Sequence, residues 1–259
     1  MMNIIRADIY RILRGKAIYI TLGVLLFLII LMVLPDVTVM VGIHTDIIDM
    51  DIVAVDGTTA ARQMLTTMDS LIFFLMPLFI VVAFAMFSCG AVKNEISTGM
   101  SRVKLYVSKL VLISVLCVLL MAVYLISGIL VTSAFRGVGS WTAGYFLTIL
   151  KAFGAQAVIL IACSSIGVFL AFVTQRAAAV IGVFLAFMFV PSLIISLLAN
   201  RFTSLTNLYH YDVTFCLKLF SYIENMSGAE IMRGLAVGVF WLLISTYAGI
   251  KIFKRAEIK

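Results

Sequence analysis

The feature that most constrains this chain is a series of long stretches without a charged side chain. Residues 110–135 contain no aspartate, glutamate, lysine or arginine. About 20 apolar residues cross a bilayer as a helix, and helices satisfy their own backbone hydrogen bonds in lipid. With 64% hydrophobic and 12% charged residues, we predict one all-α integral membrane domain over residues 1–259. Its six transmembrane helices are predicted at residues 17–34, 71–92, 110–135, 152–175, 177–200 and 234–250.

Lysine and arginine indicate how these predicted spans are oriented. Thirteen of the 19 basic residues fall on one side of the membrane and six on the other. The positive-inside rule places the richer side, which carries both termini, in the cytoplasm. The formal net charge of +7 is therefore concentrated beside anionic lipid, and we expect no nucleic acid partner.

The N-terminal residues 3–16 are predicted to form an amphipathic helix on the inner membrane surface. Ile5, Ile9, Ile12 and Leu13 share one face of this helix. Such a helix either anchors the first span or transmits force to it from a cytosolic partner. The sequence leaves both roles open.

The sequence lacks the motifs that mark several other classes of function. The phosphate-binding pattern G-x-x-x-x-G-K-[ST] and the zinc pattern H-E-x-x-H are both absent. His44 lies among Asp46, Asp49 and Asp51 in an acidic joint, residues 35–70, but their spacing matches no metal loop, so a solvated outer loop is favoured. No pair of charged residues is expected at the centre of the bilayer. This disfavours a proton-driven carrier, because such carriers relay protons through buried acidic or histidine residues. We therefore predict no enzyme activity, no metal site and no cofactor in this chain.

Inside the predicted spans, three residues are candidates for moving parts or a substrate path. Pro77 and Pro191 each remove a helical hydrogen bond, which favours a kink and makes them candidate hinges. Gln156 is a candidate for lining a substrate path, although polar residues inside a membrane more often serve helix packing. The outer joint, residues 201–233, is predicted to hold helices on or in the outer leaflet that form an external gate.

A short cytoplasmic joint at residues 91–101 follows the second predicted span. Val92 and Ile96 fall on one helical face, and Gly99 is suited to ending the helix. A short helix held against the membrane in this way is suited to docking a soluble partner. The alternative is that its bases are ordinary positive-inside residues. The pattern around this joint includes Gly90, Val92, Lys93, Asn94, Gly99, Ser101, Arg102, Tyr106, Ser108 and Lys109.

This pattern resembles the signature of type-2 ABC exporter permeases, especially the peptide-resistance and bacteriocin-immunity branch. The six spans, the basic N-terminal helix and the long outer joints resemble that family over the whole chain, whereas Ala91 departs from its frequent threonine. The resemblance implies a coupling helix that fits a groove of a separate ATPase. The implied ATPase-coupling residues are Lys93, Asn94, Glu95, Ile96, Ser97, Thr98, Gly99 and Arg102.

The same resemblance implies the partners and the cargo. Two copies of an ABC ATPase would carry ATP and Mg, and a second permease, identical or homologous, would complete the transporter in a bacterial cell membrane. The substrate would be an antimicrobial peptide or a similar amphipathic molecule, moved outward from the membrane. Two alternatives stay open, namely a membrane peptide sensor or scaffold without transport, and a stand-alone channel or carrier.

Overall fold

The structure, a computed structural model, describes residues 2–33, 56–88, 92, 97, 99–201 and 208–255. All regular structure within these ranges is helical. His44 and the acidic residues beside it lie outside the described residues. The elements are α1 (Met2–Arg14), α2 (Lys16–Val33), α3 (Gly57–Thr66), η1 (Met68–Ser70), α4 (Leu71–Leu78), the π-helical η2 (Phe79–Phe84), α5 (Ala85–Ser88), α7 (Arg102–Arg136), α8 (Ala143–Thr174), α9 (Ala177–Arg201), α10 (Val213–Leu219), η4 (Phe220–Asn225) and α11 (Gly228–Arg255).

Four of the described helices, α7, α8, α9 and α11, are long and apolar enough to cross a membrane. Two bent pairs raise the count to as many as six: α1 meets α2 at 62°, and α3 meets the segment Met68–Phe84 at 53°. The all-helical class predicted from the sequence is therefore confirmed for the described part. Its hydropathy is that of a membrane protein.

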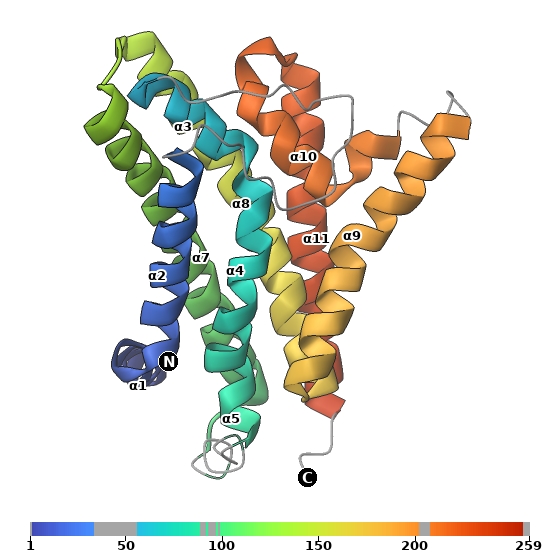
Figure 1. The fold of residues 1–259 in the computed structure, drawn as a ribbon. Coiled ribbons are helices and arrows are strands. Elements are labelled where there is room, and N and C mark those ends of the chain that lie inside the picture. Colours follow the sequence, from blue (N-terminus) through green and yellow to red (C-terminus); the bar gives the residue numbers. More distant parts are fainter. Residues whose placement is uncertain are drawn as a thin grey trace.

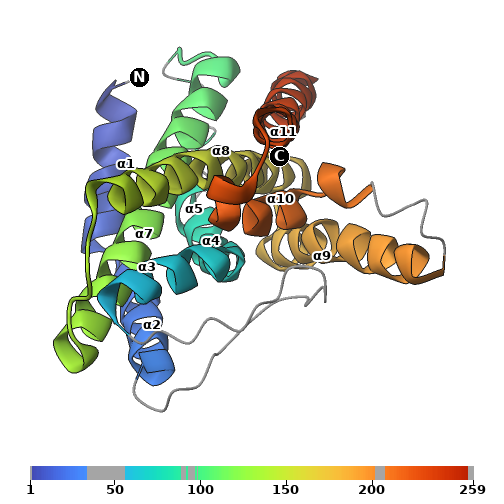
Figure 2. The same cartoon turned by 90° about the horizontal axis from the view of Figure 1, so that it is seen from above.

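Figure 1 shows a bundle with two different ends. One end, here called the terminal end, carries α1, α5 and the C-terminal end of α11. The opposite end, here called the capped end, carries α3 and α10. Figure 2 shows α8 crossing the middle of the bundle. In α8, 67% of the most apolar window is buried, against 22% in α9 and α11, so α8 is the central helix.

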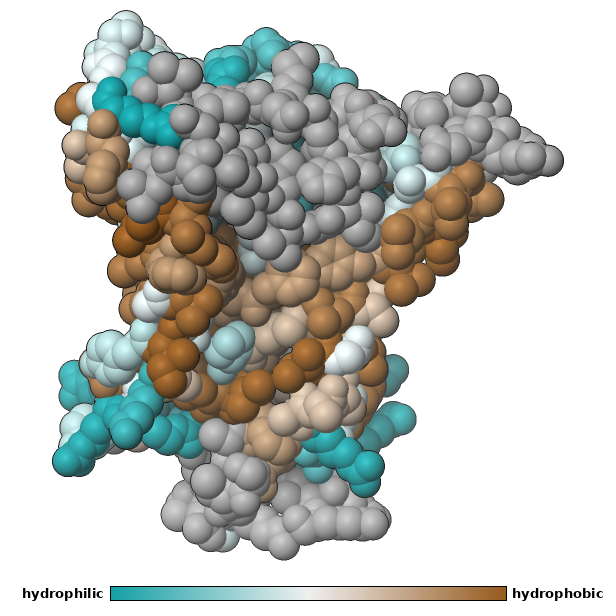
Figure 3. All heavy atoms as spheres, in the orientation of Figure 1, coloured by the Kyte–Doolittle hydropathy of each residue, from teal (hydrophilic) through white to brown (hydrophobic). Residues whose placement is uncertain are grey.

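Large apolar side chains cover much of the outside of the bundle. Figure 3 shows a hydrophobic band between hydrophilic groups at the two ends of this face. Leu130 of α7 is 63% exposed and Leu197 of α9 is 70% exposed. Contiguous apolar surface of this kind is not tolerated in water. A lipid environment explains it, because lipid solvates these side chains.

The long helices begin earlier than hydropathy predicts. Helix α7 starts at Arg102 instead of residue 110, and α8 starts at Ala143 instead of residue 152. The Ser101 side chain accepts a hydrogen bond from the Lys104 N–H, and the Thr142 side chain accepts one from the Tyr145 N–H. Such N-caps define where a helix begins, whereas hydropathy reports only the part that lipid solvates.

The prediction of a solvated loop is wrong for residues 56–70. Helix α3 packs against α7 with Ala60, Ala61 and Met64 fully buried. Asp56 begins this helix by accepting hydrogen bonds from the backbone N–H groups of Thr58 and Thr59. The missed signal was an N-cap followed by small and apolar residues at helical spacing.

Candidate functional site

The terminal end contains a buried ion pair between α1 and α7. Lys109 is 0% exposed, and its Nζ lies 2.5 Å from Asp8 Oδ2. Arg11 also donates to Asp8, with Nη2 3.1 Å from Oδ1. A buried ammonium group is costly unless it is paired. The pair therefore fixes the amphipathic N-terminal helix to the bundle.

The sequence contained a signal for this pair that charge counting missed. Asp8 follows Ile5 by three residues and precedes Ile12 by four, so it lies on the apolar face of α1. Ile12 is 2% exposed, which shows that this face packs against protein. An acidic residue on such a face indicates a buried basic partner. Lys109 is thus more than an ordinary positive-inside residue.

Arg102 joins the start of α7 to the end of α11. Its Nη1 donates to the carbonyl oxygens of Phe253 at 3.1 Å and Lys254 at 2.9 Å. The last carbonyl groups of a helix lack partners within the helix, and a cationic donor there is favourable. This contact ties the residue predicted to follow the coupling helix directly to the C-terminal helix.

Tyr106 completes the contacts at this end. Its buried ring lies 4.9 Å from the ring of Phe172 in α8, measured between centroids. It also covers Gly249 of α11, where an added Cβ would lie 2.3 Å from the Tyr106 hydroxyl oxygen. We call Asp8, Arg102, Tyr106 and Lys109 the terminal interlock. Through these side chains, α7 contacts α1, α8 and α11.

The predicted coupling segment is described only in part. Val92 is buried, Ser97 is exposed and helical, and Gly99 has a φ of +89°, the left-handed conformation expected at a helix end. The remaining coupling candidates, Lys93, Asn94, Glu95, Ile96 and Thr98, lie outside the described residues. The terminal interlock begins directly after this segment.

The two candidate hinge prolines lie in different helical environments. Pro77 lies in α4, which passes into the π-helical η2 at Phe79. A proline that removes a helical hydrogen bond is compatible with such a local change of helix type. Pro191 lies within α9, which runs without a break from Ala177 to Arg201. Helix α9 therefore continues through Pro191, and the hinge role of this residue stays a prediction.

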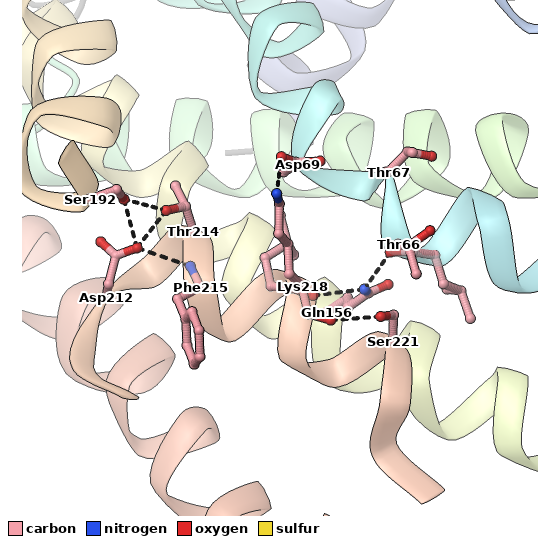
Figure 4. Close-up of polar contacts among 12 residues, drawn as sticks. Thr66, Thr67, Asp69, Gln156, Ser192, Asp212, Thr214, Phe215, Lys218 and Ser221 are labelled. Carbon is pink, nitrogen blue, oxygen red and sulfur yellow. Dashed lines mark hydrogen bonds and ion pairs between the residues drawn. The ribbon is translucent and has the colours of Figure 1, made fainter. Parts of the chain in front are cut away.

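At the capped end, Gln156 of α8 holds the ends of two short helices. Its Nε2 donates to the carbonyl oxygens of Leu65 in α3 and Leu217 in α10, each at 2.8 Å (Figure 4). Both carbonyls belong to final helical turns, where no partner exists within the helix. Gln156 is 0% exposed and lines neither of the two cavities described below. In this conformation it is a structural clamp.

Helix α10 and the first residue of η4 are packed into the protein. Phe215, Leu217 and Phe220 are 7%, 0% and 0% exposed. These three side chains pack against protein, because α8 and α9 offer α10 an apolar surface inside the bundle. That the helices of this joint lie on or in the outer leaflet and form an external gate stays a prediction.

A polar cluster connects α10 to α9 and η1. The Oδ2 of Asp212 accepts hydrogen bonds from Ser192 Oγ at 2.7 Å and from the Phe215 backbone N–H at 3.0 Å (Figure 4). Thr214 Oγ1 donates to the same oxygen at 2.5 Å. Lys218 Nζ lies 3.9 Å from Asp69 Oδ2. Sequence analysis missed this cluster because its members come from three separate segments.

Two cavities adjoin this polar cluster. The smaller, about 20 Å³, lies among Asp69, Ser192, Asp212 and Lys218 and has room for roughly one water molecule. The larger, about 190 Å³, lies between α9, the residues before α10, and α11. Asp212 lines both cavities. Within the described ranges, no three histidine, cysteine or acidic side chains are grouped as metal ligands.

Comparison with known proteins adds no family to these observations. No protein-family model matches the chain, and no curated protein matches it. The fold and the sites therefore define an all-helical protein of membrane type, with an interlocked end and a capped end.

Proposed function

We propose that the chain is the permease subunit of an ATP-driven exporter of the type-2 ABC kind. One observation carries the proposal: the later residues of the motif form the terminal interlock, directly after the predicted coupling segment. Arg102 reaches α11, Tyr106 contacts α8 and α11, and Lys109 pairs with α1. A permease needs such contacts if a movement at one short segment is to reach the whole bundle.

In this proposal, both bent helix pairs count as spans, so the chain crosses the membrane six times. The terminal end faces the cytoplasm, in accordance with the positive-inside rule, and the capped end faces outward. Two permeases, identical or homologous, enclose the path between them, and each binds one ATPase copy. ATP and Mg are held by the ATPases, so this chain itself catalyses no reaction.

The terminal interlock suggests how force would be transmitted. ATP binding draws the ATPases together and moves the coupling segment, residues 91–101, toward the bundle. Arg102 and Lys109 pass this displacement to α11 and α1 because both side chains bind those helices directly. The capped end then opens and releases a hydrophobic or amphipathic substrate, such as an antimicrobial peptide, outward.

The test is recovery of an ATPase with the tagged permease from its native membrane, identified by mass spectrometry. Glu95→Arg, in the predicted coupling segment, is expected to abolish or weaken that recovery. Glu230→Arg is the matched control, because it makes the same charge change at the start of α11, at the capped end. Arg102→Gln should lose transport, since it removes the charged hydrogen bonds to the end of α11.

The same experiment separates the alternatives. If no ATPase is recovered under conditions that preserve a control ABC complex, the exporter proposal fails, and a channel or carrier remains. If an ATPase is recovered but a hydrolysis-dead ATPase leaves the cellular phenotype unchanged, the protein is a sensor or scaffold. Equal loss of the ATPase in Glu95→Arg and Glu230→Arg would refute the proposed docking site.

A further inference from the structure

The larger cavity at the capped end has the dimensions of a small-molecule site. Its volume is about 190 Å³, and its wall includes Phe187 and Pro191 from α9, Tyr211 and Asp212 before α10, and Trp241 from α11. A cavity of roughly 150 Å³ accommodates benzene. The space therefore fits one ring or a short branched group. Tyr211 is 60% exposed, so this wall reaches the surface of the protein.

The wall combines aromatic faces with a carboxylate. The rings of Phe187 and Trp241 meet edge to face, with centroids 5.1 Å apart. Asp212 is the charged residue among the side chains that line this cavity. Aromatic faces attract organic cations through the ring quadrupole, most strongly where water is excluded. A carboxylate beside them adds direct charge attraction.

The carboxylate of Asp212 is held in place with one oxygen available. All three of its hydrogen bonds, from Ser192, Thr214 and the Phe215 backbone, reach Oδ2. No described residue donates a hydrogen bond to Oδ1, and Figure 4 shows that oxygen pointing away from the three donors. Lys218 lies against Asp69. Asp212 Oδ1 is therefore the carboxylate oxygen that is open to a cationic ligand.

We propose that this cavity binds a monovalent organic cation that carries a compact apolar group. The ammonium or guanidinium group lies against Asp212 Oδ1 and the aromatic rings, and the apolar group fills the remainder. A lipid acyl chain is a poorer occupant, because it would remove water from the carboxylate and supply no positive charge or hydrogen-bond donor in its place. A metal ion would find aromatic walls instead of oxygen ligands. As a substrate site, it rests on the proposed function and specifies cationic amphipathic molecules as cargo.

The test uses purified protein in detergent micelles, without any ATPase. The chain has two tryptophans, so Trp141→Phe leaves Trp241 in the cavity wall as the reporter. Benzyltrimethylammonium is titrated while tryptophan fluorescence is recorded, with benzenesulfonate as the anionic probe of similar size. Saturable binding is expected for the cation alone. Asp212→Asn is expected to weaken it at least about tenfold.

The control variants make the result specific to this cavity. Asparagine is a good N-cap, so Asp212→Asn should preserve α10. Asp56→Asn removes another capping carboxylate at the capped end, outside the cavity, and should leave cation affinity unchanged. Equal affinity for the cation and the anion, no saturable binding of the cation, or equal affinity in Asp212→Asn would each overturn the proposal. Since no ATPase is present, the site can hold while the exporter proposal fails.

Discussion

The two ends of the bundle are held together by different kinds of contact. At the terminal end, Lys109 and Arg102 bind helices that are distant in sequence, through an ion pair and charged hydrogen bonds. At the capped end, short helices are held by the Gln156 amide, by hydrogen bonds to Asp212, and by two ion pairs that are longer or more exposed, Lys218–Asp69 at 3.9 Å and Arg62–Glu224. Breaking a buried ion pair costs about 3–5 kcal/mol. An exposed ion pair contributes about 0–1 kcal/mol, and a hydrogen bond contributes about 1–3 kcal/mol, with the higher values where one partner is charged.

This difference matches the roles proposed for the two ends. An end that receives force from a partner needs rigid contacts, so that displacement is transmitted without being absorbed. An end that opens for cargo needs contacts that separate at a small cost. The cavity beside Asp212 lies at the end with the weaker contacts. The comparison therefore predicts unequal responses to substitutions at the two ends.

The largest effect is expected from Asp8→Ala at the terminal interlock. The substitution leaves the Lys109 ammonium buried without its partner, and should lower the free energy of unfolding by about 3–5 kcal/mol. Lys109→Met should cost less, because Asp8 keeps Arg11 at 3.1 Å. Unfolding by denaturing detergent, followed by circular dichroism, measures both changes.

The control for this prediction is Lys104→Met, which removes an exposed lysine from the first turn of α7. The double variant Asp8→Leu with Lys109→Met should recover most of the lost stability, because no unpaired charge remains. If Asp8→Ala were no more destabilising than Lys104→Met, the two ends would not differ in the way described.

A smaller and more local effect is expected from Gln156→Leu. The substitution removes two hydrogen bonds to helix-end carbonyls and should cost about 2 kcal/mol. Hydrogen exchange should quicken in α3 and α10 and stay unchanged around Arg102. Ser164→Ala is the matched control, since its hydroxyl bonds only to Ile161 within α8. Uniform acceleration over both ends would show that Gln156 is not a clamp of the capped end.

The smallest effect is a pH dependence of α3. A hydrogen bond from the Thr58 hydroxyl, together with the Thr59 backbone N–H, lowers the pKa of Asp56 below its ordinary value. A lowered pKa in the folded state stabilises the protein above the unfolded value of about 3.9, and this stabilisation is lost as the pH falls through the folded pKa. Amide exchange in α3 should therefore quicken below about pH 4.

The variant Asp56→Asn tests whether this carboxylate is the responsible group. Its exchange in α3, corrected for the intrinsic rate, should show a flatter pH profile than the wild-type protein. Asparagine retains the capping hydrogen bond but does not titrate in this range. Identical profiles for the two proteins would assign the pH dependence to another group.

Much of the fold could be predicted from local patterns, and most of the site could not. The apolar stretches located the long helices, and the spacing of Ile5 and Ile12 located the apolar face of α1. Helix α3 was missed because hydropathy over a span-length window overlooks a short buried helix of small residues. Gln156 was recognised as a polar residue inside a span, but its two carbonyl partners come from separate helices.

The sequence by itself determined the helical backbone and the long apolar stretches that are typical of a membrane protein. Solvation by lipid and backbone hydrogen bonding within a helix depend on neighbouring residues, so a linear pattern reveals them. The tertiary structure decided that Asp8 meets Lys109 and that Asp212 and Trp241 share a cavity wall. These contacts depend on which faces of separate helices pack together. The periodicity of a single helix does not specify which neighbouring helix its faces contact.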